Sequence, residues 1–176
     1  MTIFRNEENS PALKLQEVEV MAFRVACGNF IGLSDLKATE LEEPGRAFLP
    51  VGIPYAKDMI TVRGKGTSNE PSINDGNWLF FHLIKGGSIY HDRLVLAEEQ
   101  DSITGDRYTL KKYDHETFYK KDGSYSHTVI RLLPLNPAHS PIVLDPQGRY
   151  AVIGLYVGQA AHIQRVDKYR YPDAGE

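Results

Sequence analysis

Three short stretches of the sequence contain residue types and spacings that could support chemistry based on a serine nucleophile. The first surrounds Ser68, in the turn GTSNEP between Gly66 and Pro71. Such a turn exposes a hydroxyl and leaves backbone N–H groups, here those of Ser68 and Asn69, free to stabilise an oxyanion. The same residue types are ordinary turn formers, and Glu70 excludes the G-x-S-x-G hydrolase elbow. A plain surface turn is therefore the competing interpretation.

The second stretch, YTLKKY, contains Lys111 on the strand face opposite Tyr108 and Leu110. Lysine acts as a general base only when it is neutral, so its pKa must fall by about 3 units from about 10.4 to work near pH 7. Burial beside a serine hydroxyl would lower the pKa in this way. A solvent-facing strand lysine is the alternative.

The third stretch, RVACGNF, contains Cys27 followed by Gly28. A small residue followed by glycine is sterically easy to present in a cleft, whereas a buried cysteine beside a turn glycine is the alternative. Because Cys27 is the single cysteine, we expect no internal disulfide and no multi-cysteine metal cage. The six histidines lack metal-binding spacing. We therefore predict neither a metal nor a cofactor, and a Ser–His–Asp triad through His91–Asp92 or Asp114–His115 is a weak alternative.

A mostly β fold must position these residues. Glycine and proline interrupt the chain, and the runs between them are rich in Val, Ile, Leu, Tyr and Phe. Six runs predict strands: 58–64, 77–84, 93–98, 107–113, 127–133 and 150–157. Residues 11–21 fit a short helix or another strand. No long segment keeps a 3.6-residue period, so we predict a single, mostly β domain with coiled sheets.

The composition restricts the function classes. The chain has 176 residues, 41% of them hydrophobic, which suffices for one domain with a core. Its formal net charge of -3 argues against a nucleic-acid-binding face. No apolar run reaches the about 20 residues of a membrane span, and the N-terminus does not resemble a secretory signal. We expect a cytoplasmic protein without direct nucleic-acid binding or membrane insertion.

The three stretches, in this order, resemble the self-cleaving Ser–Lys peptidase domain of LexA-type repressors and the mutagenesis protein UmuD, peptidase family S24. That family places a small residue and glycine first, then a turn of the type G-D-S-M-x-P, then a strand Y/F-T-V-K-[RK]-L. Further matches follow in order: SINDGNWLF (72–80), HDRLVLA (91–97), LPLNPAHSPI (133–142) and YAVIGLYV (150–157). The likeness runs from about residue 24 to 160.

The resemblance implies specific roles in an acyl-transfer reaction. Ser68 would be the nucleophile and Lys111, rather than Lys112, the base, 43 residues further along the chain. Cleavage would fall between Cys27 and Gly28, and the backbone N–H groups of Ser68 and Asn69 would hold the oxyanion.

The resemblance also implies an architecture and partners. We expect a LexA C-terminal-domain-like or UmuD-like coiled β-sheet with few short helices. The expected divisions are an N-terminal arm (1–23), a cleavage region and connector (24–50), a peptidase core (51–169) and a C-terminal end (170–176). Expected partners are a second copy of the chain, giving a homodimer, and a RecA-type filament or a helicase or DNA-binding protein in a stress or DNA-damage response.

Two departures from the family pattern leave alternatives open. Thr67 replaces the family's Asp before the serine, and Asn69 replaces the Met after it. The segment between Ser68 and Lys111 is also longer than the family pattern predicts. The alternatives are a catalytically silent interaction module with the same fold and a peptidase that cuts other proteins in trans.

Overall fold

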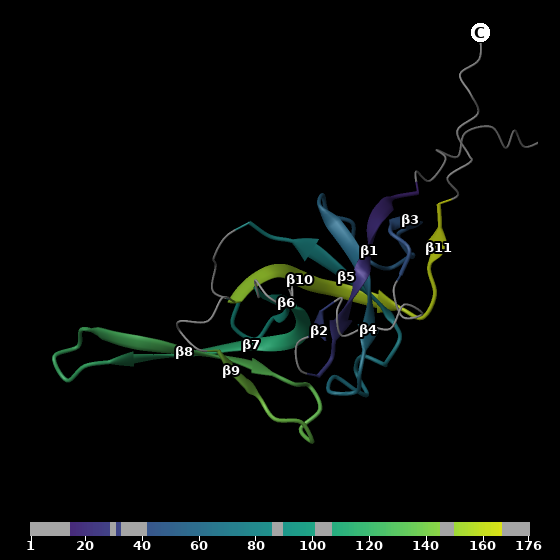
Figure 1. Ribbon diagram of the computed structural model, residues 1–176. Helices are drawn as coiled ribbons and strands as arrows, with labels where there is room; N and C mark the ends of the chain where they lie inside the picture. The colour runs from purple at the N-terminus through teal and green to yellow at the C-terminus, as the bar shows by residue number, and fades with distance from the viewer. Residues whose placement is uncertain are drawn as a thin grey trace, which may run out of the picture.

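The computed structural model describes residues 15–28, 31–32, 42–85, 90–100, 107–144 and 150–166 (Figure 1). The strands are β1 (Glu17–Ala26), β2 (Ile31–Gly32), β3 (Gly45–Phe48), β4 (Met59–Lys65), β5 (Trp78–Leu83), β6 (Leu94–Glu99), β7 (Arg107–Tyr119), β8 (Tyr125–Leu133), β9 (Ile142–Leu144), β10 (Tyr150–Ala160) and β11 (Gln164–Arg165). They form one 11-stranded sheet. The predicted mostly β fold is confirmed, and each of the six predicted runs overlaps a strand.

No helix occurs within these described ranges, although the resemblance predicts a few short ones. The described residues therefore include no helix that could cross a membrane. The connections that the structure describes are turns and irregular segments, which the frequent glycines and prolines favour.

The strand order brings three sequence-distant segments together. The order is β11-β3-β1-β4-β5-β10-β6-β7-β8-β9, with β2 paired separately to β7. Strand β1 runs parallel to β4 and also touches β7, where Ala26 lies opposite Thr109. This last contact closes the path from β1 through β4, β5, β10, β6 and β7 into a ring. The C-terminal end of β1 therefore lies between the end of β4 and the start of β7.

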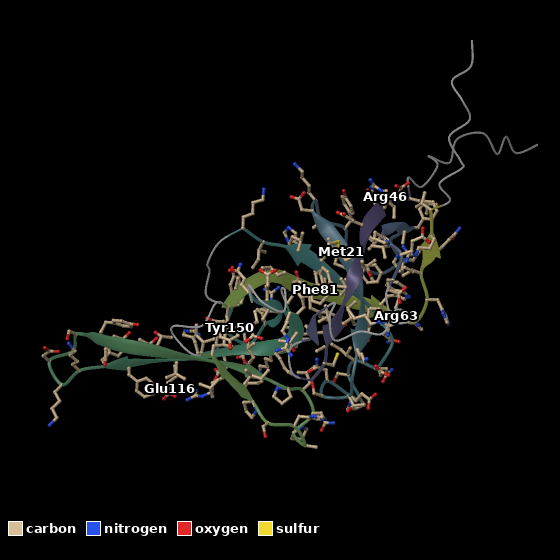
Figure 2. All side chains as sticks on the ribbon, viewed as in Figure 1. Met21, Arg46, Arg63, Phe81, Glu116 and Tyr150 are labelled. Atoms are coloured by element: carbon tan, nitrogen blue, oxygen red, sulfur yellow. The ribbon has the colours of Figure 1, made fainter. Side chains whose placement is uncertain are left out.

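An apolar cluster fills this ring. Its buried members are Val25, Cys27, Ile60, Val62, Ile73, Leu79, Phe81, Leu96 and Leu110. Figure 2 shows Phe81 within the body of the molecule. Each large apolar side chain buried in this way contributes about 1.5–3 kcal/mol to stability. The ends of β1, β4 and β7 are thus anchored in the core rather than carried on a loose loop.

Strand β1 begins inside the segment that we predicted as an N-terminal arm. Its sequence EVEV alternates, and Val18 and Val20 are each 1% exposed. Strand β3, in the predicted connector, pairs with β1 on the side opposite β4. Of the two structures predicted for 11–21, the described part is a strand from Glu17. The first part of the predicted N-terminal arm, 1–14, and the predicted C-terminal end, 170–176, lie outside the described residues.

Strands β7 and β8 continue beyond the body as a two-stranded ribbon (Figure 1). The sequence predicted β7 only to residue 113, but the strand extends to Tyr119. Glu116 lies on this ribbon (Figure 2) and pairs across it with Arg131 at 2.9 Å. Near the ribbon's end Tyr119 and Tyr125 are 66% and 60% exposed. The extension escaped prediction because it is polar and lacks a buried face.

Candidate active site

Backbone contacts hold Ser68 in the turn that follows β4. Gly66 adopts a φ of 103°, a conformation that favours glycine and lets the chain leave the strand. The Asn136 N–H donates to the Ser68 carbonyl oxygen at 2.8 Å, and the Glu70 N–H donates to the Thr67 carbonyl oxygen at 3.0 Å. Ser68 itself is fully buried. The hydroxyl predicted in an exposed turn therefore lies inside the protein.

Asn69 connects this turn to two other segments. Its Nδ2 donates to the Leu110 carbonyl oxygen at 2.9 Å, and its Oδ1 accepts from the Leu135 N–H at 3.2 Å. The side chain is fully buried. The residue that departs from the family pattern thus ties the Ser68 turn to β7 and to the segment after β8, a role that the sequence did not predict.

Lys111 extends from β7 into the same interior region. Its side chain is 2% exposed, and its Nζ donates hydrogen bonds to Ser68 Oγ and to the Cys27 carbonyl oxygen, the latter at 2.8 Å. Burial lowers the pKa of Lys111 to about 8, while the nearby Cys27 thiol opposes this shift. Lys112 points elsewhere and pairs with Asp92 at 2.7 Å.

The Cys27–Gly28 peptide lies between the end of β4 and β7. The Cys27 N–H donates to the Lys65 carbonyl oxygen at 2.7 Å. A Cβ atom at Gly66 would lie 3.7 Å from the Gly28 nitrogen, so the turn passes close to this peptide. The Cys27 side chain is fully buried, and burial raises the pKa of its thiol. The structure therefore brings the predicted cleavage site to Ser68 and Lys111.

The oxyanion role predicted for two N–H groups remains a prediction. The Cys27 carbonyl oxygen accepts a hydrogen bond from Lys111 Nζ. Among the backbone hydrogen bonds described for this region, none joins that oxygen to the N–H of Ser68 or Asn69. Attack by Ser68 would require the developing oxyanion to find such donors.

A cavity of about 270 Å³ opens onto this group and is lined by Gly28, Ser68, Lys111, His139 and Ser140. The last two residues come from the LPLNPAHSPI stretch, and His139 Nε2 lies 3.5 Å from Thr67 Oγ1. This stretch was not predicted to lie at the site, and its match to the family pattern was the signal that could have placed it there. The cavity thus borders the buried Ser68 and Lys111 and the Gly28 side of the predicted cleavage bond.

The other sites considered from the sequence lie apart from this group. His91 pairs with Asp114 at 3.3 Å and with Asp92 at 3.5 Å, and its ring packs against His115. Among the residues that the structure describes, no set of His, Cys, Asp and Glu side chains is arranged to hold a metal ion.

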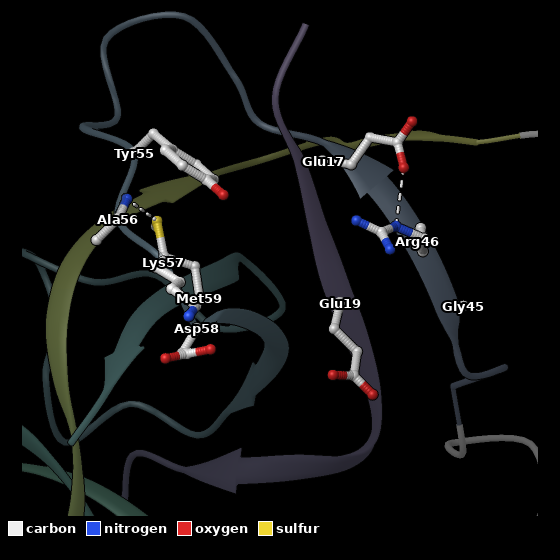
Figure 3. A pocket seen from close by; sticks show the side chains of 9 residues that line it. All are labelled: Glu17, Glu19, Gly45, Arg46, Tyr55, Ala56, Lys57, Asp58 and Met59. Carbon is white, nitrogen blue, oxygen red and sulfur yellow. Dashed lines mark hydrogen bonds and ion pairs between the residues drawn. The ribbon is translucent and has the colours of Figure 1, made fainter. Parts of the chain in front are cut away.

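A larger cavity of about 600 Å³ lies beside β1, β3 and the loop before β4 (Figure 3). An ion pair of 2.8 Å between Glu17 and Arg46 borders it, and the Ala56 N–H donates to Met59 Sδ at 3.0 Å. Its lining mixes acidic and basic side chains and includes none of the predicted site residues. Of these two cavities, the smaller is the one that predicted site residues line.

Comparison with known proteins identifies the family of the chain. A family model described as Peptidase S24-like matches residues 20–157, which span the cleavage segment, the Ser68 turn and β7. Comparison with curated proteins gives no match. The family predicted from the ordered motifs is thereby confirmed: the chain belongs to the peptidase S24-like family.

Proposed function

We propose that the chain is a Ser–Lys peptidase that cleaves its own Cys27–Gly28 bond. One observation carries this proposal: Lys111 Nζ contacts both Ser68 Oγ and the Cys27 carbonyl oxygen. A buried amine, a hydroxyl and an amide carbonyl of the same chain meet at one point, as an intramolecular acyl transfer requires. Membership of the peptidase S24-like family supports the same chemistry.

The proposed reaction has two stages. Neutral Lys111 accepts the Ser68 proton while Ser68 Oγ bonds to the Cys27 carbonyl carbon. The bond between the Cys27 carbonyl carbon and the Gly28 nitrogen then breaks, and the Gly28 nitrogen accepts this proton from Lys111. In the second stage Lys111 accepts a proton from water, the hydroxide oxygen bonds to the acyl carbon, and Ser68 leaves with its proton restored. The products are a carboxylate on Cys27 and a free amino group on Gly28.

The protonation of Lys111 sets the pH dependence of this reaction. Since burial lowers its pKa to about 8, the amine is positively charged below that pH and neutral above it. Roughly a fifth of the molecules hold a neutral base at pH 7.4, and about nine tenths at pH 9. We predict a cleavage rate that rises about tenfold per pH unit below pH 7 and levels off above pH 9. Rates measured from pH 6 to 10 by gel densitometry check this profile.

Intact-mass measurement tests the cleavage itself. The full chain, incubated at pH 9, should give a new species that begins at Gly28. Ser68→Ala and Lys111→Ala should stay intact, whereas Lys112→Ala, which removes the neighbouring lysine, should be cut at the parental rate. An intact parent chain would favour the silent module. An intact chain whose Ser68 reacts with an acylating serine-protease probe would favour a peptidase acting in trans.

We also propose, from family membership alone, a cytoplasmic homodimer that acts in a stress or DNA-damage response. In that role a RecA-type filament, or a helicase or DNA-binding partner, would stimulate cleavage at neutral pH. Cleavage assays with and without an activated filament test the stimulation, and light scattering tests the dimer.

A further inference from the structure

Thr109 contacts the cleavage segment on both sides of Cys27. Its Oγ1 donates to the Ala26 carbonyl oxygen at 3.0 Å and lies 3.2 Å from the Gly28 carbonyl oxygen. The side chain is fully buried. Thr109 precedes Lys111 by two residues on β7, so both side chains project from the same strand face. Three successive carbonyl groups are thus held by two neighbouring side chains of one strand.

We propose that Thr109 is a positioning residue that fixes the Cys27–Gly28 bond against Ser68 and Lys111, an inference that rests on the proposed self-cleavage. A hydroxyl has one hydrogen, so it bonds to one carbonyl at a time. The two alternative bonds restrain the segment at both ends, while the central carbonyl stays with Lys111. Small displacements matter at this point, because an error of about 1 Å in attack geometry can cost about a hundredfold in rate.

The backbone pairing around Thr109 leads to the same conclusion. Ala26 pairs with Thr109 in parallel orientation, and Ile31 pairs with Tyr108 in antiparallel orientation. Strand β7 therefore holds the chain before and after the cleavage bond. Between these two pairings, the Thr109 hydroxyl supplies the polar restraint on the carbonyls flanking Cys27.

A purely space-filling role would be served by valine, which has the same shape without the hydroxyl. We therefore compare Thr109→Val with Thr109→Ser, which keeps the donor. Thr61→Val is the matched control. Thr61, on β4, is also fully buried, and its hydroxyl donates to the Leu79 carbonyl oxygen at 3.1 Å. Cleavage of the full chain is followed from pH 6 to 10, together with thermal unfolding.

We expect Thr109→Val to lower the plateau rate by about tenfold or more without moving the midpoint of the pH profile, since Lys111 keeps its surroundings. Thr109→Ser should stay within about threefold of the parent, and Thr61→Val should cleave at the parental rate. Parental cleavage by Thr109→Val, or equal rate losses in both valine variants, would overturn the inference while leaving the proposed peptidase intact.

A second measurement separates this inference from the proposed function. In the Ser68→Ala background, where no cleavage is expected, amide hydrogen exchange of residues 22–28 reports how firmly the segment is held. Faster exchange with Thr109→Val than with Thr61→Val supports the positioning contact. Equal exchange in the two variants overturns it. A parent chain that never cleaves, by contrast, counts against the peptidase proposal.

Discussion

The interior placement of Lys111 opposes the stability of the fold, and the effect depends on pH. Its pKa falls from 10.5 to about 8 on folding, so between these values the unfolded chain binds more protons than the folded chain. Stability should therefore rise with pH across this window. The free-energy cost of burying the charged Lys111 amine, about 3 kcal/mol, applies in full below pH 8. This cost accompanies a base that is largely neutral at mildly alkaline pH.

Replacing Lys111 with methionine should remove this pH dependence. In the Ser68→Ala background, which avoids cleavage, the chain with Lys111 should gain about 2.5 kcal/mol between pH 7 and 10 relative to Lys111→Met. Urea unfolding at the two pH values measures the difference. The contributions of tyrosine titration are common to both chains and cancel in this comparison. A difference that does not change with pH would contradict the assigned burial.

Asn69 should prove as important for folding as for activity. Asn69→Ala removes two hydrogen bonds and leaves the Leu110 carbonyl and Leu135 N–H without their partner. We expect a loss of about 2–4 kcal/mol in unfolding free energy and slower cleavage. Thermal unfolding and intact-mass assays check both effects. Asn77→Ala, which removes a half-buried contact to Gln159 at 2.9 Å, is the control and should cost less.

Among the elements, we expect the ribbon of β7 and β8 to be separable from the body. Its distal residues, 117–128, belong to none of the described apolar clusters. Replacing them with a two-residue Asn-Gly turn should change the unfolding free energy by less than about 1 kcal/mol and leave cleavage unaltered. Leu132→Ala at the ribbon's base is the contrasting variant, because Leu132 is fully buried and its truncation should cost about 2–5 kcal/mol. Unfolding or inactivity of the shortened chain would show that the ribbon supports the site.

The elements also show how far sequence reasoning extends. Strands such as β4 and β5 were predictable because buried apolar runs between turns are a local signal. The extension of β7 was not predictable, because it is polar and lacks a buried face. The short strands β3 and β11 were not, because they pair with segments distant in sequence. The pairing of Ser68 with Lys111 came from family resemblance, because neither residue is distinctive alone. The side-chain roles of Thr109 and Asn69 were missed because these side chains bind backbone groups far away in sequence, which no local pattern reports.

At the scale of the whole molecule, β1 is an interior strand, so cutting after Cys27 should not by itself release it. It pairs with β3 on one side and β4 on the other. Val18, Val20 and Val25 are each at most 1% exposed. Removing the strand would expose two strand edges and these side chains. The burial of each side chain contributes about 1.5 kcal/mol or more to stability. The cleaved protein should persist as a complex of two pieces.

Gel filtration of cleaved protein checks this expectation. The piece ending at Cys27 should co-elute with the piece beginning at Gly28 and separate only in denaturant. Val20→Asp, which places a charge in the buried face of β1, should weaken the association. Ready separation of the unmodified pieces under native conditions would mean that the strand contacts are too weak to hold them.

The contact between Lys111 and the Cys27 oxygen has a consequence for turnover. If β1 stays in place after hydrolysis, the new carboxylate lies where the carbonyl now accepts its 2.8 Å hydrogen bond from the amine. An ion pair there would favour the protonated amine and withhold the base from Ser68. Each molecule would then cut once and be inhibited by its own product. Activity on other chains would require β1 to leave the site first.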